Sequence, residues 1–281
     1  MNLNVASTKL QSIVEEASRK KSLINSDRLK VVEGAVLGAG ASATVFRGSY
    51  RDQDVAVKAF RPVELCDDDV EKIGREIGIV AGLRHRNVVY LHGLCVRPPA
   101  VCAVYEFCDH DLSVEIRDRI SDKTWTAEAR WRCTIDVLSG IAYAHAKGVW
   151  HRDVKLENIF VKSSEARCKL GDFGLAVKSA VHTPRRGRSH SFDDASSSSS
   201  VGGTEVYQPP ECFEGNEDVF GAVDAWGLGC VLFEMATSQS LPTDPPFLGQ
   251  LLLEDDSAKH SRAIADKFLS LIHISEPTRP Y

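Results

Sequence analysis

The sequence predicts an α+β protein with two lobes, a β-rich first lobe with one main helix and a helical second lobe. Three observations lead to this fold class. Short β-rich runs broken by glycines and polar turns fill residues 31 to 60, and more follow at 88 to 107. One amphipathic helical pattern lies between them at 69 to 83. Longer helical patterns occupy 126 to 147 and 219 to 236, so strands precede helices, as is typical of α+β proteins.

The composition fits a globular protein that recognises its partners locally. The 281 residues are 43% hydrophobic and 26% charged, enough to bury a large core. The net charge of -5 argues against a protein-wide field for nucleic acid. Eight scattered cysteines without a C-x-x-C pair are expected to be reduced core residues. With no signal peptide and no membrane span in the sequence, we expect a cytoplasmic protein, with the nucleus as the alternative.

The chain is expected to begin with a helical extension over residues 1 to 29. Apolar residues recur at helical spacing there, at Leu10, Ile13, Val14 and Ala17. We expect a surface helix over residues 5 to 21 that docks on its own domain, rather than a membrane anchor.

The helix at 69 to 83 combines an apolar side with a row of glycines. Its apolar side consists of Val70, Ile73, Ile77, Val80 and Leu83. Glu76 lies at the edge of that side, and Gly74, Gly78 and Gly82 form a row on the opposite face. Each glycine costs the helix about 1 kcal/mol relative to Ala. Packing against the rest of the first lobe must therefore hold the helix.

A glycine-rich turn and a lysine suggest phosphate binding in the first lobe. In "GAGASATV", Gly38 and Gly40 would let backbone N–H groups approach phosphates, although Ala43 replaces a third glycine and a plain hairpin is the alternative. Lys58 ends the strand "VAVK" just downstream and could reach the same phosphates. Because Glu76 is on the helix side facing the sheet, we expect it to pair with Lys58.

The stretches "HRDVKLEN" and "GDFG" supply the groups that phosphoryl transfer needs. Such chemistry requires oxygen ligands for Mg²⁺, a carboxylate for the attacking hydroxyl and positive charge on the transferred group. The candidates are Asp153, Lys155, Asn158 and Asp172. These residue types are also favoured in surface turns, but that interpretation must explain each motif separately.

In order and context, these motifs and a later "PPE" match the set that marks protein kinases. Residues 30 to 268 resemble a eukaryotic protein kinase, and "YRDQDVAVKAF" with "GTEVYQPPE" is most similar to the tyrosine-kinase-like group. The resemblance implies a bilobal fold with an N-lobe over 30 to 107, a C-lobe over 108 to 268, and ATP with Mg²⁺ in the cleft between them.

The resemblance also implies a role for each candidate residue. Asp153 would be the catalytic base, Lys155 would touch the γ-phosphate, and Asn158 and Asp172 would hold Mg²⁺. Tyr105 would be the gatekeeper and would narrow the rear of the nucleotide cleft. The implied nucleotide-binding residues are Leu37, Gly38, Gly40, Val45, Ala56, Lys58, Glu76, Glu106, Cys108 and Asp172, with Glu106 and Cys108 acting through their backbones.

Lys155 two residues after the base, and Thr204 before "PPE", match the serine/threonine pattern. We therefore expect an ATP-dependent serine/threonine protein kinase with protein substrates. The alternative is a pseudokinase scaffold, supported by Ala43. In the first case Asp153→Asn should lower the transfer rate about 10²- to 10⁴-fold, while ATP binding survives.

The activation segment is expected to be a phosphorylation switch. Residues 179 to 200 carry almost no large apolar side chains, so we expect them to be mobile. An upstream kinase acting there would create a phosphate that pairs with Arg152 and orders the segment. The candidate regulatory residues are Arg152, Thr183, Ser189, Ser191 and Thr204.

The end of the sequence is expected not to be native. Residues 269 to 281 read "LSLIHISEPTRPY" and resemble a translated sequencing adapter. A natural terminal strand is the alternative. The C-lobe would then lack its last helices, and Glu211 would lack its arginine partner. Exposed apolar faces would make the chain poorly soluble or weakly active.

Overall fold

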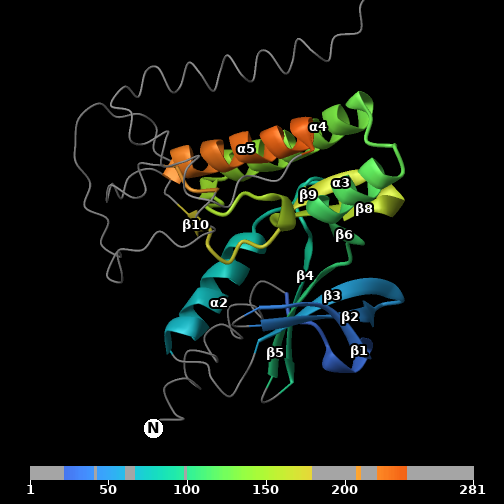
Figure 1. Ribbon diagram of the computed structural model, residues 1–281. Helices are drawn as coiled ribbons and strands as arrows, with labels where there is room; N and C mark the ends of the chain where they lie inside the picture. The colour runs from blue at the N-terminus through green and yellow to red at the C-terminus, as the bar shows by residue number, and fades with distance from the viewer. Residues whose placement is uncertain are drawn as a thin grey trace, which may run out of the picture.

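The computed structural model describes residues 22–40, 43–60, 67–97, 100–178, 207–209 and 220–238. Figure 1 shows a β-sheet and one helix at one end and a largely helical part at the other, joined by the chain that follows β5. The predicted α+β fold with two lobes is confirmed.

The first lobe is built on a five-stranded antiparallel sheet in the order β1-β2-β3-β5-β4. The strands are β1 (Leu29–Ala39), β2 (Ala43–Tyr50), β3 (Gln53–Phe60), β4 (Leu91–Arg97) and β5 (Ala100–Glu106). Side chains alternate between the two faces of β3: Val55 and Val57 are fully buried in a small apolar cluster, whereas Ala56 and Lys58 face the neighbouring cleft. Because side chains alternate along the strand, Lys58 points toward the cleft.

The helix of the first lobe, α2 (Asp67–Val80), packs one side against the sheet. Ile73, Ile77 and Val80 are buried in the main core, and Glu76 is buried among them. Gly78 faces open space on the other side. The chain turns after Val80, so the helix ends earlier than predicted, but Leu83 still reaches the core.

A segment before β1 lies along the outer strand of the sheet. Ile24 N–H donates to the Leu94 carbonyl at 2.7 Å, and Leu94 N–H donates to the Ser22 carbonyl at 2.8 Å. A Cβ on Gly93 would meet the Ser22 carbonyl oxygen at 2.0 Å, and the φ of Gly93 is +152°. Only glycine therefore allows this segment to cover β4.

The described part of the second lobe contains three α-helices and five short strands. The helices are α3 (Leu112–Ser121), α4 (Ala127–Ala146) and α5 (Phe220–Thr237); the strands are β6 (His110–Asp111), β7 (Val149–Trp150), β8 (Ile159–Lys162), β9 (Arg167–Leu170) and β10 (Val177–Lys178). Asp111 caps α3 by accepting from two backbone N–H groups, and Thr126 caps α4. β6, β8 and β9 form one small sheet, and β7 pairs with β10.

Helices α4 and α5 lie side by side in Figure 1. On α5, Val223, Val231 and Met235 are buried, whereas Leu228 and Leu232 are half-buried. The helix therefore buries one face more completely than the others, although its sequence is apolar nearly all round. A Cβ on Gly227 would meet the Val154 carbonyl at 2.7 Å, so this glycine lets α5 approach the loop after β7.

Several predictions fall outside the described residues. They concern the helix at 5 to 21, the activation-segment residues Thr183, Ser189, Ser191 and Thr204, the partner of Glu211, and the tail from 269 to 281. Those predictions stand as they were made.

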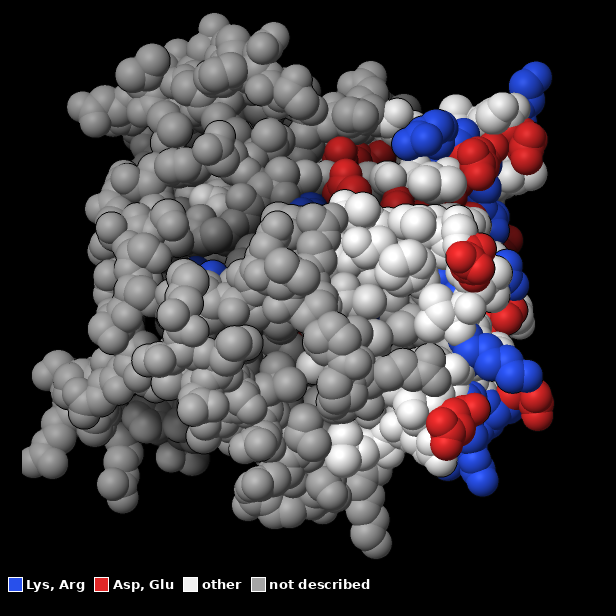
Figure 2. Space-filling model, turned by 90° about the horizontal axis from the view of Figure 1, so that it is seen from below, with Lys and Arg blue, Asp and Glu red and all other residues white. Residues whose placement is uncertain are grey.

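Two properties of the described part bear on the expected setting of the protein. The six described cysteines are free thiols, all buried or half-buried. None of the described helices is both long and apolar enough to span a bilayer. Figure 2 shows acidic and basic side chains interspersed along one edge of the visible described surface.

Candidate active site

A buried ion pair joins the sheet to helix α2. Lys58 Nζ on β3 lies 2.7 Å from Glu76 Oε1 on α2, and the two side chains are only 18% and 7% exposed. The same ammonium lies 3.3 Å from Asp172 Oδ1 in the "GDFG" loop. Burial alone would lower the Lys58 pKa, but the two carboxylates outweigh it and hold the pKa above its ordinary value. Lys58 thus stays charged at neutral pH.

The predicted gatekeeper contacts this ion pair directly. Tyr105 is on β5, opposite Ala56 of β3, and its hydroxyl donates to Glu76 Oε1 at 3.0 Å. Burial, with the nearby Glu76 charge, holds the Tyr105 pKa well above its ordinary value, so the hydroxyl keeps its proton. Glu76 therefore has two donors, one from each of two neighbouring strands.

Asp172 is held in a strained backbone conformation beside the lysine. Its φ is +53°, in the left-handed region that non-glycine residues rarely adopt. Phe173 is buried and packs edge-on against the His151 ring, with the centroids 4.8 Å apart. Burial would raise the Asp172 pKa, but the charge and hydrogen bond of Lys58 bring it below its ordinary value. Asp172 is ionised at neutral pH.

One buried carboxylate fixes the "HRD" loop. Asp224 of α5 is fully buried and accepts from the backbone N–H groups of His151 at 2.8 Å and Arg152 at 2.6 Å. His145 Nε2 lies 2.7 Å from the same carboxylate. Arg152 has a φ of +66°, and these bonds hold the loop in that unfavourable shape.

The "HRD" loop is also tied to the "GDFG" loop. Asp153 N–H donates to Nδ1 of His151, which leaves Nε2 as the protonated nitrogen that donates to the Gly171 carbonyl at 2.9 Å. Gly171 N–H in turn donates to the Asn158 carbonyl at 2.9 Å. Asn158 and Asp172, distant in sequence, are therefore neighbours.

The predicted base is held by two partners. Asn158 Nδ2 lies 2.7 Å from Asp153 Oδ2, and it also donates to the Asp153 carbonyl at 2.8 Å. Lys155 Nζ lies 2.8 Å from the same Oδ2. The Asp153 carboxylate is thus oriented on the second lobe, next to the Asp172 loop.

A cleft of about 300 Å³ lies between the lobes at these residues. The sequence-predicted residues that line it are Leu37, Gly38, Val45, Ala56, Lys58, Glu76, Tyr105, Glu106, Cys108 and Asp172. Four predicted residues are not among them: Gly40, Asp153, Lys155 and Asn158. The Gly40 N–H donates to the Ala43 carbonyl at 2.8 Å and closes the hairpin. Burial and the Glu106 charge raise the pKa of the Cys108 thiol to about 12.

The comparison with known proteins identifies the family. Residues 31–267 match the family model of the protein kinase domain, so the chain belongs to the protein kinase family. The chain is 33% identical over 207 residues to cyclin-dependent kinase 17 of Caenorhabditis elegans, covering 73% of this chain and 29% of that protein.

Two further relatives are about as similar. Wall-associated receptor kinase-like 4 of Arabidopsis thaliana is 31% identical over 210 residues, 73% of this chain and 26% of the relative. Human mitogen-activated protein kinase kinase kinase 13 is 30% identical over 203 residues, which cover 72% of this chain and 18% of the relative. This chain thus spans less than a third of the length of these relatives.

Protein kinases use ATP with Mg²⁺, and the cleft residues fit that pair. Mg²⁺ prefers carboxylate and amide oxygens and usually completes its shell with phosphate and water. Asp172 provides a carboxylate that is 49% exposed, and Asn158 turns its amide nitrogen toward Asp153, which leaves the amide oxygen as the ligand atom. Within the described ranges no group of three or more His, Cys, Asp or Glu could hold a metal ion.

Sequence reasoning missed one residue of this site, Asp224, and one contact, between Tyr105 and Glu76. No role was assigned to Asp224, although a lone carboxylate in an otherwise apolar helix signals a buried hydrogen-bonding partner. The Tyr105 hydroxyl was expected only to narrow the cleft, and its bond to Glu76 was not foreseen. Both contacts join distant segments, so the local pattern around either residue is uninformative.

Proposed function

We propose that this protein is an ATP-dependent serine/threonine protein kinase. The observation that carries the proposal is a pair of charged clusters: Lys58, Glu76 and Asp172 meet in the cleft, and Asp153, Lys155 and Asn158 meet on the loop that is bonded to Gly171 beside Asp172. Each group is ionised or oriented as phosphoryl transfer requires.

In this mechanism the chain mainly positions the reactants and stabilises charge. Lys58, fixed by Glu76, binds the nucleotide phosphates; Asp153 accepts the proton of the attacking hydroxyl. Lys155 neutralises charge on the transferred group. Asn158 and Asp172 would hold Mg²⁺, which would supply positive charge at the phosphates.

The serine/threonine preference rests on sequence. Lys155 lies two residues after the base, which is the serine/threonine pattern, and Thr204 is expected beside Asp153. The kinase names of the relatives favour the same class. Membership of the tyrosine-kinase-like group, a cytoplasmic location and switching by phosphates on the activation segment through Arg152 are parts of the same proposal.

A pseudokinase scaffold is the second candidate. Ala43 in place of the third glycine favours it, and Ala43 is buried on β2, where it pairs with Phe60 of β3. The paired Lys58 and the oriented Asp153 favour catalysis instead.

A transfer assay with γ-labelled ATP and a mixed serine, threonine and tyrosine peptide library separates the two candidates. We expect labelled phosphoserine or phosphothreonine from the wild-type chain. Asp153→Asn should lower the rate about 10²- to 10⁴-fold while nucleotide binding persists. Nucleotide binding without transfer by the wild-type protein supports the scaffold, and phosphotyrosine alone contradicts the serine/threonine assignment. Asp118→Asn, an exposed change on α3, is the matched control.

A further inference from the structure

Two cysteines lie directly opposite each other in the sheet of the first lobe. Cys95 of β4 and Cys102 of β5 are Cα partners in the antiparallel register, and both are thiols in this structure. Among the six described cysteines, no other two are register partners in a sheet. None of the roles assigned above uses either thiol.

The backbone spacing of this pair suits a disulfide. Opposite residues of an antiparallel pair point to the same face, with Cα atoms about 4.5 to 5.5 Å apart and Cβ atoms at a similar separation. A disulfide needs Cα atoms about 4.4 to 6.8 Å apart and Cβ atoms about 3.5 to 4.5 Å apart. The strands are therefore already placed for the bond, and only a small approach of the two Cβ atoms is needed.

The pair lies on the face of the sheet that is turned away from the nucleotide cleft. Cys95 and Val104 are buried in the small apolar cluster of the first lobe, and Cys102 packs against that cluster. Tyr105, the next residue after Val104, lines the cleft instead, because side chains alternate along the strand. A bond between the two sulfurs would therefore form without blocking the cleft.

The two thiols differ in their access to solvent. Cys95 is 3% exposed, and the segment that precedes β1 is bonded to its neighbour Leu94 and contributes Ile24 to the same cluster. Cys102 is half-buried. A small oxidant can therefore reach Cys102 from solvent, whereas Cys95 is shielded beside it. An accessible thiol next to a second thiol that can resolve it is the arrangement found in redox-sensitive sites.

Packing alone does not account for the arrangement. Cysteines in a reducing compartment are ordinarily small apolar core residues. That role requires each side chain to fill space in the cluster, but it does not require the two thiols to face each other across neighbouring strands. The register supplies what a disulfide needs and what packing does not.

We propose that Cys95 and Cys102 are a modification site at which a peroxide forms a reversible disulfide. In the first step the Cys102 thiolate attacks one peroxide oxygen and the O–O bond breaks. The second oxygen leaves as hydroxide, which takes up the thiol proton and becomes water. Cys102 is thereby oxidised to a sulfenic acid.

In the second step the Cys95 sulfur attacks the sulfenic sulfur of Cys102. The S–S bond forms and the S–O bond breaks, and the departing hydroxide takes up the Cys95 proton as water. Over both steps the two thiols lose two hydrogen atoms, and one peroxide molecule is reduced to two water molecules.

The bond is expected to be easily reversed. Because the Cβ atoms must lie closer in a disulfide than in an ordinary ladder, the bond would hold β4 and β5 under strain. Strained disulfides are more readily reduced than relaxed ones. The pair would thus record exposure to peroxide as a removable cross-link between two strands.

Differential alkylation of the folded 281-residue chain tests the proposal. The protein is treated with hydrogen peroxide, its remaining thiols are blocked with iodoacetamide in urea, and the disulfides are reduced with dithiothreitol. N-ethylmaleimide then labels the released thiols, and peptide fragmentation by mass spectrometry locates the label. We expect equal label on Cys95 and Cys102 after peroxide and none on either without it.

Two variants separate a disulfide from independent oxidation. Cys102→Ser removes the sulfur that meets the peroxide, and the label on Cys95 should fall about tenfold or more, because a buried thiol alone is inert. Cys95→Ala removes the second sulfur, so Cys102 should remain as a sulfenic acid that dimedone traps. Cys230→Ser, a half-buried change on α5, is the control and should leave both labels unchanged.

Three results would overturn the proposal. They are label confined to Cys133 and Cys168, which share a side-chain hydrogen bond elsewhere in the fold, oxidation of Cys102 in the wild-type chain with no label on Cys95, and label on the pair only when peroxide is added in urea. The wild-type map decides the matter even if a variant fails to fold. Because the assay needs neither nucleotide nor turnover, its outcome is independent of the proposed kinase activity.

Discussion

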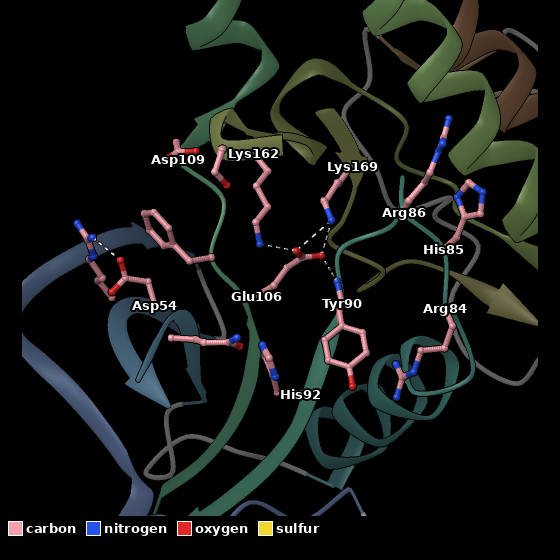
Figure 3. Close-up of a pocket in the computed structure, with 14 residues that line it drawn as sticks. Asp54, Arg84, His85, Arg86, Tyr90, His92, Glu106, Asp109, Lys162 and Lys169 are labelled. Carbon is pink, nitrogen blue, oxygen red and sulfur yellow. Dashed lines mark hydrogen bonds and ion pairs between the residues drawn. The ribbon is translucent and has the colours of Figure 1, made fainter. Parts of the chain in front are cut away.

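The two cavities beside the joining segment have opposite charge balances. The described lining of the nucleotide cleft contains one lysine, Lys58, and five acids: Glu76, Glu106, Asp109, Asp111 and Asp172. A second cavity of about 820 Å³, shown in Figure 3, contains five Lys and Arg residues against three acids. The cations are Arg47, Arg84, Arg86, Lys162 and Lys169, and the acids are Asp54, Glu106 and Asp109. A site with excess carboxylate attracts a divalent cation, and one with excess guanidinium attracts an anion. The same short segment therefore borders two cavities of opposite charge balance.

The difference arises from strand geometry. Tyr105 and Glu106 are consecutive on β5, and successive side chains of a strand point to opposite faces. The Tyr105 hydroxyl bonds to Glu76 at the cleft, whereas the Glu106 carboxylate bonds to Lys162 and Lys169. Adjacent residues thus support two different ionic clusters, one catalytic in the proposed function and one structural.

The largest expected effect comes from removing the cation of the cleft. Lys58→Met leaves Glu76 and Asp172 without their shared positive partner and should lower the transfer rate about 10²- to 10³-fold, as for the loss of one preorganised donor. ADP release measured at saturating ATP gives the rate. Lys72→Met, an exposed change on α2, should have no effect. A normal rate in Lys58→Met would end the charge argument for the cleft.

A Lys→Met substitution in the second cavity, at Lys169, should instead lower the stability of the protein. Lys169 is 5% exposed and contacts both oxygens of the buried Glu106. Lys169→Met leaves that carboxylate with fewer partners and should lower the free energy of unfolding by about 3 to 5 kcal/mol. Urea denaturation measures this loss.

Lys30→Met on the exposed face of β1 is the control and should change the free energy of unfolding by less than about 0.5 kcal/mol. If Lys169→Met is as stable as that control, Glu106 and Lys169 are not a structural pair, and the contrast between the two cavities is lost.

A smaller effect is expected from the gatekeeper hydroxyl. Tyr105→Phe removes one donor from Glu76 but leaves the Lys58 bond, so about 0.5 to 1.5 kcal/mol of positioning is lost. The value of kcat/KM should fall about two- to tenfold. Tyr143→Phe removes a hydroxyl bond far from the cleft and should leave kcat/KM unchanged. Equal effects of both changes would point to general destabilisation.

The smallest effect concerns the Cys108 thiol. Its pKa is raised from the ordinary 9.0 to about 12, so its reactive thiolate is about a thousandfold rarer than that of an ordinary cysteine at neutral pH. Alkylation by iodoacetamide, followed by peptide mass mapping, should be correspondingly slow. The rate should rise about tenfold per pH unit from pH 7 to 9, because the thiolate is the attacking form. A rate that levels off in that range would place the pKa much lower.

Local sequence was sufficient for the strand and helix layout and for the residues of the cleft. Lys58 ends an alternating strand, and Asp153, Asn158 and Asp172 stand in short motifs whose chemistry depends on residue type and spacing. The helix pattern around Glu76 likewise faced it toward the sheet. The structure brings Lys58, Glu76 and Asp172 into one cluster and joins Asp153 to Asn158.

Contacts across the fold could not be predicted in the same way. Asp224 binds the "HRD" loop from more than seventy positions away, and Arg84 meets Tyr143 across 59 positions. The partners of Glu106 also come from another lobe. No periodicity links such positions, since they meet only when the lobes pack.

The sequence by itself determined the elements and the reactive groups, because backbone periodicity and side-chain chemistry are local properties. Apart from the Lys58–Glu76 pair, tertiary structure decided which carboxylate meets which cation, and on which side of β5. Those choices depend on burial and distance, which arise only when strands, helices and loops from both lobes come together.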